Sequence, residues 1–516
     1  MSEKTKENSR LPETLKRGET ILLLGAVFVT SICGLAYELV IGATGAYIAG
    51  DGVRQFAFTI GLFLSSMGFG SFLSRKVSSG QALQTFISAE LMIGLLGGIS
   101  HPSLYLLYAY TQSYETIFYA LLVVIGGLTG LEIPLITRIL SKSSPLRINI
   151  SNVLSLDYMG ALITTVLFPL FLLPHFGLWY TSVFFGLINT ILGGILLFSF
   201  RKASWFRKIL PGFLFTMATL LMLAGGGRMF MAMADGAVYN EEIVFAKFSQ
   251  YQRIVLTRWR TDLRLYLNGN IQFSSYDEYR YHEALVHPLM TSIPSRERIL
   301  VLGGGDGLAV REIFKYKDVR HVDLVDLDPE VVKLARTNVH LKELNKNSLN
   351  NPKLHYHPED AWKFAGRIKG LYNAIIVDLP DPSSENLVKV YSKQFYKLLS
   401  NHLAADGAMV VQATSPYFNR RSFWCIVRTV RATGLFTKPI HAHVPSFGEW
   451  GFVLAAPHKI ISNGKLSVPV KYLKNRMLET MAEFPGDLNE EQVGISTLDH
   501  PVILSYYLED YKKYFK

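Results

Sequence analysis

The sequence predicts a multi-span α-helical membrane domain, followed by a soluble α/β domain with a doubly wound sheet and a small β-rich segment at its start. Up to residue 231 the chain is mostly apolar and has few charges. From Tyr251 onward, short strand patterns alternate with helix patterns, which is typical of a parallel sheet. The total of 516 residues is too long for one ordinary domain.

The distribution of charge and the two cysteines limit which binding partners and metal sites can be expected. The net charge is +11, and many basic residues lie in short loops between apolar runs. This pattern orients membrane proteins, whereas nucleic-acid binding needs a basic face on a soluble domain. We therefore expect a lipid bilayer and no nucleic acid. Cys33 and Cys425 lack metal-ligand spacing and are not expected to form a disulfide, and we expect no metal site.

The N-terminal part predicts a charged tail, 1–19, and a bundle of about seven helices over 20–234. The first apolar run, from Ile21, is longer than the core of a cleavable signal peptide. Runs of about 20 apolar residues can cross a bilayer. The runs are 20–48, 56–74, 82–109, 115–140, 156–174, 178–200 and 209–231. Gly225–Arg228 interrupts the end of the last run.

Two carboxylates, Glu38 and Glu132, lie inside these apolar runs. Intramembrane carboxylates are costly and usually face a cavity or a partner. One interpretation is a site for a cation or amine within the bundle. The other is a buried carboxylate that is hydrogen-bonded to a neighbouring helix for packing.

The soluble part begins with a predicted β-rich segment, 235–280, and continues with a Rossmann-like domain, 281–516. Asn268-Gly269 separates two alternating runs and predicts a hairpin turn. A helix is expected near 277–291. The later strands are expected at 298–303, 321–327, 353–357, 373–378 and 407–413, with helices at 308–316, 329–337, 360–367 and 393–402.

The turn Gly303–Gly307, Gly-Gly-Gly-Asp-Gly, directly follows the first of these strands. Glycines there let the backbone approach a nucleotide closely. A phosphate site favours N–H groups and positive charge. Asp306 therefore indicates a ligand that carries a cation, such as an aminated adenosine sulfonium.

Further carboxylates fall at strand ends, where doubly wound sheets bind ligands. Asp326, about 20 residues past the glycine turn, is placed to bind ribose hydroxyls, and Asp360 to bind an adenine amino group. Either residue alone could instead be a capping or turn residue. Asp378 ends the fourth strand. These features together fit any adenosine-binding enzyme, methyltransferases included.

The combination of motifs resembles the polyamine aminopropyltransferase (spermidine synthase) family, in its membrane-fused form. The resemblance covers about 245–455, and the apolar runs resemble the membrane-fused branch. The matching segments are Tyr251-Gln252, Asp277–His287, Gly303–Gly307, Asp326–Asp328, Glu359-Asp360, Asp378–Pro382, Tyr391–Tyr396 and Gln412.

The resemblance implies decarboxylated S-adenosylmethionine as donor, putrescine as acceptor, spermidine and methylthioadenosine as products, no further cofactor, and a homo-oligomer, most simply a dimer. Asp306 would pair with the donor's ammonium and repel the carboxylate of ordinary S-adenosylmethionine. Gln252 and His282 would position the donor beside Gly303 and Gly305. Asp326 would hold its ribose and Asp360 its adenine.

Asp378 would be the general base, aided by Tyr281. The acceptor would be bound by Tyr281, Asp381 and Gln412. A simple turn at Asp381-Pro382 is the alternative. The chain departs from the family at 383–386, where a Gly-Pro segment is usual. It also departs at Phe447, where a tyrosine usually contacts the acceptor's far end, and Glu449 is the candidate replacement.

Two other functions stay open: transfer to a different amine, and a polyamine transporter or sensor whose soluble domain binds ligand. Asp306 argues against a methyltransferase, because it would face the substrate carboxylate. Loop charges place the tail in the cytoplasm, and seven crossings would place the catalytic domain outside. Since the donor is cytoplasmic, we expect a multi-pass cell-membrane protein with a cytoplasmic catalytic domain, in which 209–231 does not cross.

Overall fold

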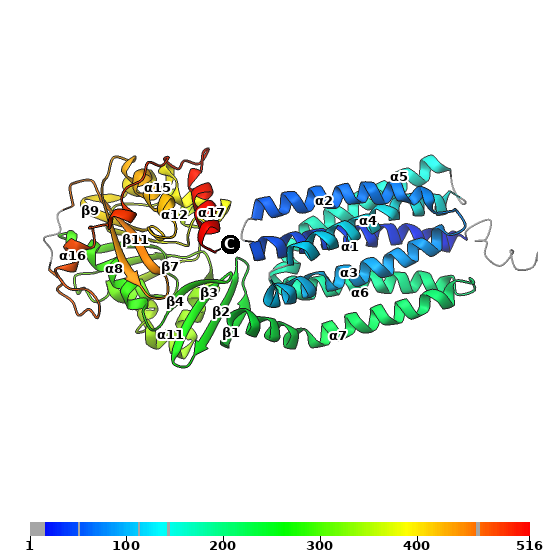
Figure 1. Ribbon diagram of the computed structural model, residues 1–516, viewed down its shortest axis with the longest axis horizontal. Helices are drawn as coiled ribbons and strands as arrows, with labels where there is room; N and C mark the ends of the chain where they lie inside the picture. The colour runs from blue at the N-terminus through cyan, green and yellow to red at the C-terminus, as the bar shows by residue number, and fades with distance from the viewer. Residues whose placement is uncertain (1–15, 50–51, 112–113, 142–144, 461–464, 516) are drawn as a thin grey trace, which may run out of the picture. The chain divides into compact units, whose positions relative to one another are not determined.

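The computed structural model describes residues 16–49, 52–111, 114–141, 145–460 and 465–515. The chain divides into two compact units, Met1–Glu241 and Glu242–Lys516 (Figure 1). Residues 1–15 of the predicted tail lie outside the described residues. Both cysteines are free and buried.

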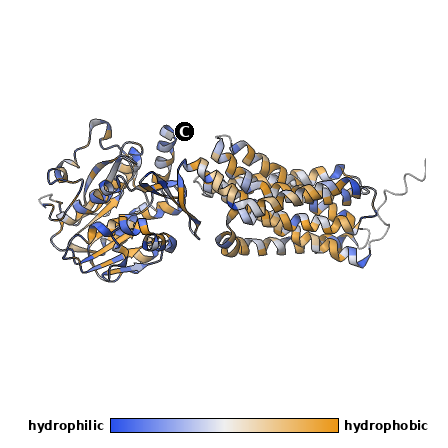
Figure 2. Cartoon of the chain, turned by 90° about the horizontal axis from the view of Figure 1, so that it is seen from below, coloured by the Kyte–Doolittle hydropathy of each residue, from blue (hydrophilic) through white to orange (hydrophobic). Residues whose placement is uncertain are grey.

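The first unit is helical and apolar along its length (Figure 2). Large apolar side chains also cover its outside, among them Phe69, Leu162 and Phe215. Such surfaces are rare on soluble monomers. Its helices are α1 (Arg17–Ala49), α2 (Gly52–Leu73), α3 (Ala82–Tyr110), α4 (Tyr114–Leu140), α5 (Leu146–Leu167), α6 (Leu173–Ser199) and α7 (Phe206–Tyr239).

Six helical stretches of the described chain are long and apolar enough to cross a membrane, where the sequence predicted seven. The counts differ because α5 and α6 continue through a π-helical segment, Phe168–Leu172, and form one stretch, Leu146–Ser199. Gly177 breaks that stretch with φ of 66°, which only glycine adopts readily. Gly225–Arg228, which interrupts the last apolar run, does not end the helix: α7 runs through it, and Phe206–Tyr239 is one of the six stretches.

The second unit begins with an antiparallel sheet in the order β1-β2-β3-β4. Asn268 and Gly269 both have positive φ, 49° and 81°, as the predicted two-residue hairpin requires. The strands are β1 (Glu242–Phe248), β2 (Arg253–Trp259), β3 (Asp262–Leu267) and β4 (Asn270–Ser274).

A seven-stranded sheet follows, in the order β10-β11-β9-β8-β5-β6-β7. Five neighbouring strands are parallel, which confirms the predicted Rossmann-like architecture. They are β5 (Arg298–Gly303), β6 (His321–Val325), β7 (Leu354–His357), β8 (Tyr372–Asp378) and β9 (Leu403–Gln412). An antiparallel edge was not predicted and consists of β10 (Phe436–Val444) and β11 (Gly448–Ala456).

Helices cover both faces of this sheet (Figure 1). Ile299 and Val301 point into one core, and Leu300 and Leu302 point into the other. The helices are α8 (Glu278–Ser292), α9 (Leu308–Ile313), α10 (Pro329–Thr337), α11 (Val339–Leu344), α12 (Ala361–Ala365), α13 (Glu385–Val388), α14 (Lys393–Ser400), α15 (Arg420–Arg431), α16 (Met477–Thr480) and α17 (Val502–Phe515).

The strand order reverses between β5 and β8. From β5 the chain moves outward through β6 and β7, then returns to the other side of β5 as β8. Ligands of doubly wound sheets bind at such a switch point, beyond the carboxyl ends of the strands. Gly303 and Asp378 are register partners there.

Candidate active site

The glycine turn after β5 has room for hydrogen atoms only. Gly303 has φ of 83°, and a Cβ there would lie 1.9 Å from the carbonyl oxygen of Asp378. A Cβ on Gly305 would lie 2.5 Å from Asp326 Oδ2. The predicted donor-site glycines therefore allow the turn to pack directly against two of the predicted site carboxylates.

Asp326 and Gln252 are joined through a second aspartate. Asp326 accepts hydrogen bonds from the backbone N–H groups of Gly305 and Asp328, at 2.9 and 3.0 Å. Asp328 caps α10 and accepts a bond from Gln252 Nε2 at 3.0 Å. Burial raises the pKa of Asp326 to about 6, against these backbone bonds. Gln252, from the small sheet, is thus brought to the edge that bears the glycine turn.

His282 is buried on α8, and its Nδ1 donates to the carbonyl and the carboxylate of Glu278, at 2.8 and 2.9 Å. Burial would lower the pKa of His282, but Glu278, Asp306 and Asp378 together raise it. Burial raises the pKa of Asp306, which the charge of His282 opposes. The surrounding carboxylates therefore stabilise the charged form of His282 against the cost of its burial.

Glu278 and Arg311 support this histidine, and the sequence analysis gave them no role. Arg311 donates two bonds to the Glu278 carboxylate, both 2.8 Å long, and its Nε donates to Glu312 at 2.9 Å. Despite burial, the bonds from His282 and Arg311 lower the pKa of Glu278. The available signal was the pair of ionisable residues at i and i+4, Glu278 and His282, at the start of a helix.

Asp378 lies at the end of β8, where Tyr281 donates a hydrogen bond to its Oδ1 at 2.6 Å. Burial raises the pKa of Asp378 to about 6; Asp306 adds to the shift, and His282 and Tyr281 oppose it. The Tyr281 ring packs against Phe447, with 5.9 Å between ring centroids. The predicted base and its tyrosine partner are therefore in direct contact.

Asp381 accepts hydrogen bonds from three donors, two at the end of β9 and one on α17. Gln412 Nε2 donates to its Oδ1 at 2.9 Å, while the hydroxyls of Thr414 and Tyr507 donate to its Oδ2, each at 3.2 Å. Burial raises the pKa of Asp381, against these bonds. Tyr507 was not predicted: it lies on α17, and no sequence motif marks it.

Two of the predicted site carboxylates, Asp360 and Glu449, form ion pairs with basic side chains of the protein. Asp360 caps α12, and its Oδ2 pairs with Lys389 Nζ at 2.7 Å, so the capping interpretation describes its contacts. Burial would raise the pKa of Asp360, but Lys389 and the backbone bonds lower it. Glu449, the candidate anion for the acceptor, pairs with His441 and lies 3.4 Å from His443 on β10.

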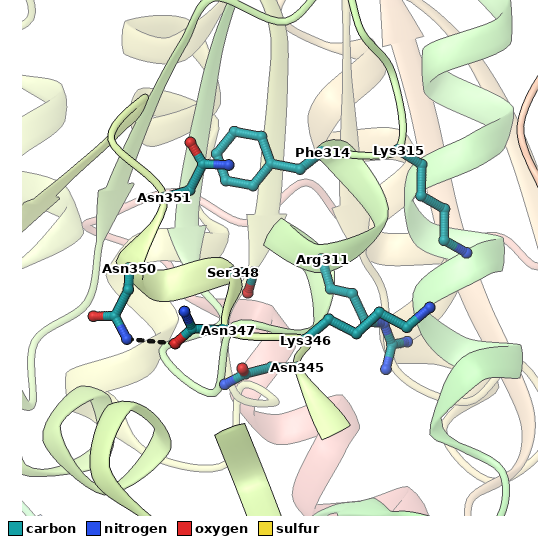
Figure 3. A pocket seen from close by; sticks show the side chains of 9 residues that line it. All are labelled: Arg311, Phe314, Lys315, Asn345, Lys346, Asn347, Ser348, Asn350 and Asn351. Carbon is teal, nitrogen blue, oxygen red and sulfur yellow. Dashed lines mark hydrogen bonds between the residues drawn. The ribbon is translucent and has the colours of Figure 1, made fainter. Parts of the chain in front are cut away.

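A cavity of about 370 Å³ lies beside the glycine turn and contains none of the predicted site residues (Figure 3). It is lined partly by Asn345 and Ser348, which donate to the carbonyl oxygens of Asp306 and Gly307 at 3.0 and 2.7 Å. These bonds fix the backbone of the glycine turn on the side away from the predicted site carboxylates. In the part of the chain that the structure describes, no group of His, Cys, Asp and Glu could hold a metal ion.

Comparison with known proteins adds the family context. A family model described as "Spermine/spermidine synthase domain" matches residues 278–463. Polyamine aminopropyltransferase 1 of Ralstonia nicotianae is 43% identical over 512 residues, 97% of each chain. The polyamine aminopropyltransferase of Leptospira interrogans is 40% identical over 491 residues, 95% of this chain and 98% of its own. A solved spermidine synthase, in complex with the transition-state analogue AdoDATO, is 22% identical over 47% of this chain and 86% of its own, with a TM-score of 0.45.

Proposed function

Because the chain belongs to the polyamine aminopropyltransferase family, we propose that it transfers the aminopropyl group of decarboxylated S-adenosylmethionine to putrescine, giving spermidine and methylthioadenosine. One observation supports this most strongly. Asp306, Asp378 and Asp381 gather at one edge of the sheet, and none forms a direct ion pair with a Lys or Arg of the described chain. The charges of Arg311 and His282 act on Asp306 only at longer range. Enclosed carboxylates without a basic partner are costly and favour cationic ligands.

The donor fits the half of the site around the glycine turn. It has a sulfonium and an ammonium but no carboxylate, so Asp306 can pair with the ammonium. Asp326 already accepts two backbone bonds, yet a carboxylate has about four lone-pair sites, which leaves room for ribose hydroxyls. Asp360 retains acceptor capacity for the adenine amino group in the same way. Gln252 and His282 would orient the donor between these contacts.

The acceptor must lose a proton before it can attack. Its amine nitrogen forms a bond to the carbon beside sulfur, the C–S bond breaks, and the electron pair neutralises the sulfonium. The proton passes to Asp378. A pKa of about 6 for Asp378 leaves a gap of about 4 units to an alkylammonium, or roughly 6 kcal/mol. An ordinary aspartate would face about 9 kcal/mol, so burial makes Asp378 the better base by about 3 kcal/mol.

We further propose that the enzyme lies in the cell membrane, with the N-terminus and the catalytic domain on the cytoplasmic side. The apolar outer surface of the bundle supports insertion, and the cytoplasmic origin of the donor supports the side. A shared side requires an even number of crossings, so in this proposal α7 does not span the bilayer, although it is long and apolar enough to do so. A reporter fused at the C-terminus tests this placement. Reporter activity in the cytoplasm supports it, and activity outside the membrane contradicts it.

The reaction is tested with purified full-length protein, decarboxylated S-adenosylmethionine and a panel of amines, by following methylthioadenosine. We expect release with putrescine and loss of release in Asp378→Asn. Asp406→Asn, an exposed aspartate on β9, is the matched control and should keep full turnover. Failure of every amine to release methylthioadenosine would exclude the proposal.

A further inference from the structure

A polar cluster lies in the core of the apolar bundle. Glu90 on α3 and Asn189 on α6 are both fully buried. Asn189 Nδ2 donates to Glu90 Oε2 at 2.9 Å and to the Glu90 carbonyl at 3.1 Å. Glu90 Oε1 and Asn189 Oδ1 have no hydrogen-bond partner among the described residues, and neither does the buried hydroxyl of Tyr37 on α1. All three orphan oxygens can accept hydrogen bonds.

Close helix packing brings these groups together. The ring of Tyr37 lies over Gly97 of α3, where a Cβ would be 2.4 Å from the ring. Gly193 brings α6 against α3, because its Cβ would lie 3.7 Å from Glu90 Cβ. Glu132, buried on α4, interacts electrostatically with Glu90, and Tyr37 interacts with both carboxylates. Four helices thus contribute polar groups to one region of the core.

This cluster lacks positive charge. No ion pair within the described chain involves Glu90 or Glu132, and the nearby base Arg138 is occupied by the carbonyls of Ser74 and Val77, at 2.6 and 2.8 Å. A buried carboxylate without a partner is costly, and carboxylates within apolar helices usually serve a function. Glu90 was not predicted, and it rather than Glu38 is the carboxylate that interacts with Glu132.

The buried oxygens without hydrogen-bond partners indicate what kind of ligand would fit this cluster. Glu90 accepts a bond from Asn189, and Glu132 accepts one from Thr30. Three buried oxygens still lack a hydrogen-bond partner, and neither carboxylate has a cation within the described chain. A protonated primary amine supplies three N–H donors and one positive charge on a single small group. A metal ion fits less well, since the described residues contain no His, Cys, Asp and Glu group with metal-ligand geometry.

We infer that the core of the helical bundle binds a protonated amine between Glu90, Glu132, Asn189 and Tyr37. This second site lies in a different unit from the catalytic residues. It gives the apolar helices a ligand-binding role in addition to anchoring, and it does not depend on the transfer reaction.

Equilibrium binding of radiolabelled putrescine and spermidine to full-length protein tests the inference. Asp381→Asn serves as the background, because under the proposed function it should weaken amine binding in the catalytic domain. We expect amine binding to persist and to weaken by more than about 100-fold when Glu90→Gln is added, as when one partner of a buried ion pair is lost. Glu115→Gln, an exposed glutamate on α4, is the matched control and should bind normally.

Several outcomes would overturn the inference. These are the absence of bound amine in the Asp381→Asn protein, equal binding after Glu90→Gln and Glu132→Gln, and competition by Na⁺ or Mg²⁺ in place of amines. Methylthioadenosine release by Glu90→Gln in the otherwise natural chain shows that the protein is folded. Glu90-dependent amine binding without any methylthioadenosine release would uphold this site and refute the proposed reaction.

Discussion

Tyr507→Phe removes one hydroxyl and leaves the aromatic ring, so it isolates the hydrogen bond from α17 to Asp381. Gln412 and Thr414 would remain as the donors to this carboxylate. Well-formed bonds to charged groups contribute about 1.5–3 kcal/mol. At 3.2 Å the bond from Tyr507 is long for an O–H donor, so we expect the lower limit, about 1.5 kcal/mol. This corresponds to roughly a tenfold change.

The loss should appear in acceptor binding, because the hydroxyl stabilises the charged form of Asp381 and fixes its direction. Steady-state kinetics of methylthioadenosine release should show a KM for putrescine about tenfold higher, with kcat and donor affinity nearly unchanged. Tyr506→Phe is the matched control, since its hydroxyl accepts from the Gly494 N–H at 3.1 Å instead. An unchanged KM in Tyr507→Phe, or an equal rise in Tyr506→Phe, would refute the role of Tyr507.

Four further predictions follow from the site. Asp378→Asn should lower kcat by about 100-fold or more, the usual worth of a general base, and calorimetry should show unchanged donor affinity. Because burial raises the pKa of Asp378 to about 6 from an unfolded value near 4, its ionisation destabilises the folded state progressively between these pH values. Asp378→Asn should therefore stabilise the folded state at pH 7 by up to about 3 kcal/mol, seen as a higher melting temperature, and have little effect at pH 3, where the carboxyl is largely neutral. For the same reason kcat/KM should fall as the pH drops through about 6, and a profile without this limb would contradict Asp378 as base. Lysine cannot reproduce the two bonds from Arg311 to Glu278. In Arg311→Lys the Glu278 carboxylate should therefore orient His282 less well, and the KM for the donor should rise. An unchanged donor KM would assign Arg311 to stability alone.

Local patterns predicted most of the fold, because they depend on neighbours in the chain. The apolar runs gave the helices of the first unit, and the alternation of strands and helices gave the parallel sheet. The positive φ values at Gly303, Gly304 and Gly307 explain why glycine is repeated in the turn after β5. The separate runs 156–174 and 178–200 predicted a break near Gly177, but they could not show that one helical stretch continues on both sides of it.

The remaining features depend on contacts between distant segments. Tyr507 meets Asp381 only because α17 docks on the catalytic unit, 126 residues further along the chain. Glu90 lies in an apolar run with no motif around it, and only helix packing shows Asn189 beside it. Glu449 was assigned by its position in the sequence, yet the cross-strand pairing of β10 with β11 places it opposite His443.

The central claim is that the carboxylates at the switch point select a cationic aminopropyl donor. The most direct measurement gives the purified enzyme putrescine with either decarboxylated or ordinary S-adenosylmethionine and identifies the products by mass spectrometry. We predict spermidine and methylthioadenosine from the decarboxylated donor alone, with Asp306→Asn losing affinity for it. Methyl transfer from ordinary S-adenosylmethionine, or equal binding of both donors, would contradict the account.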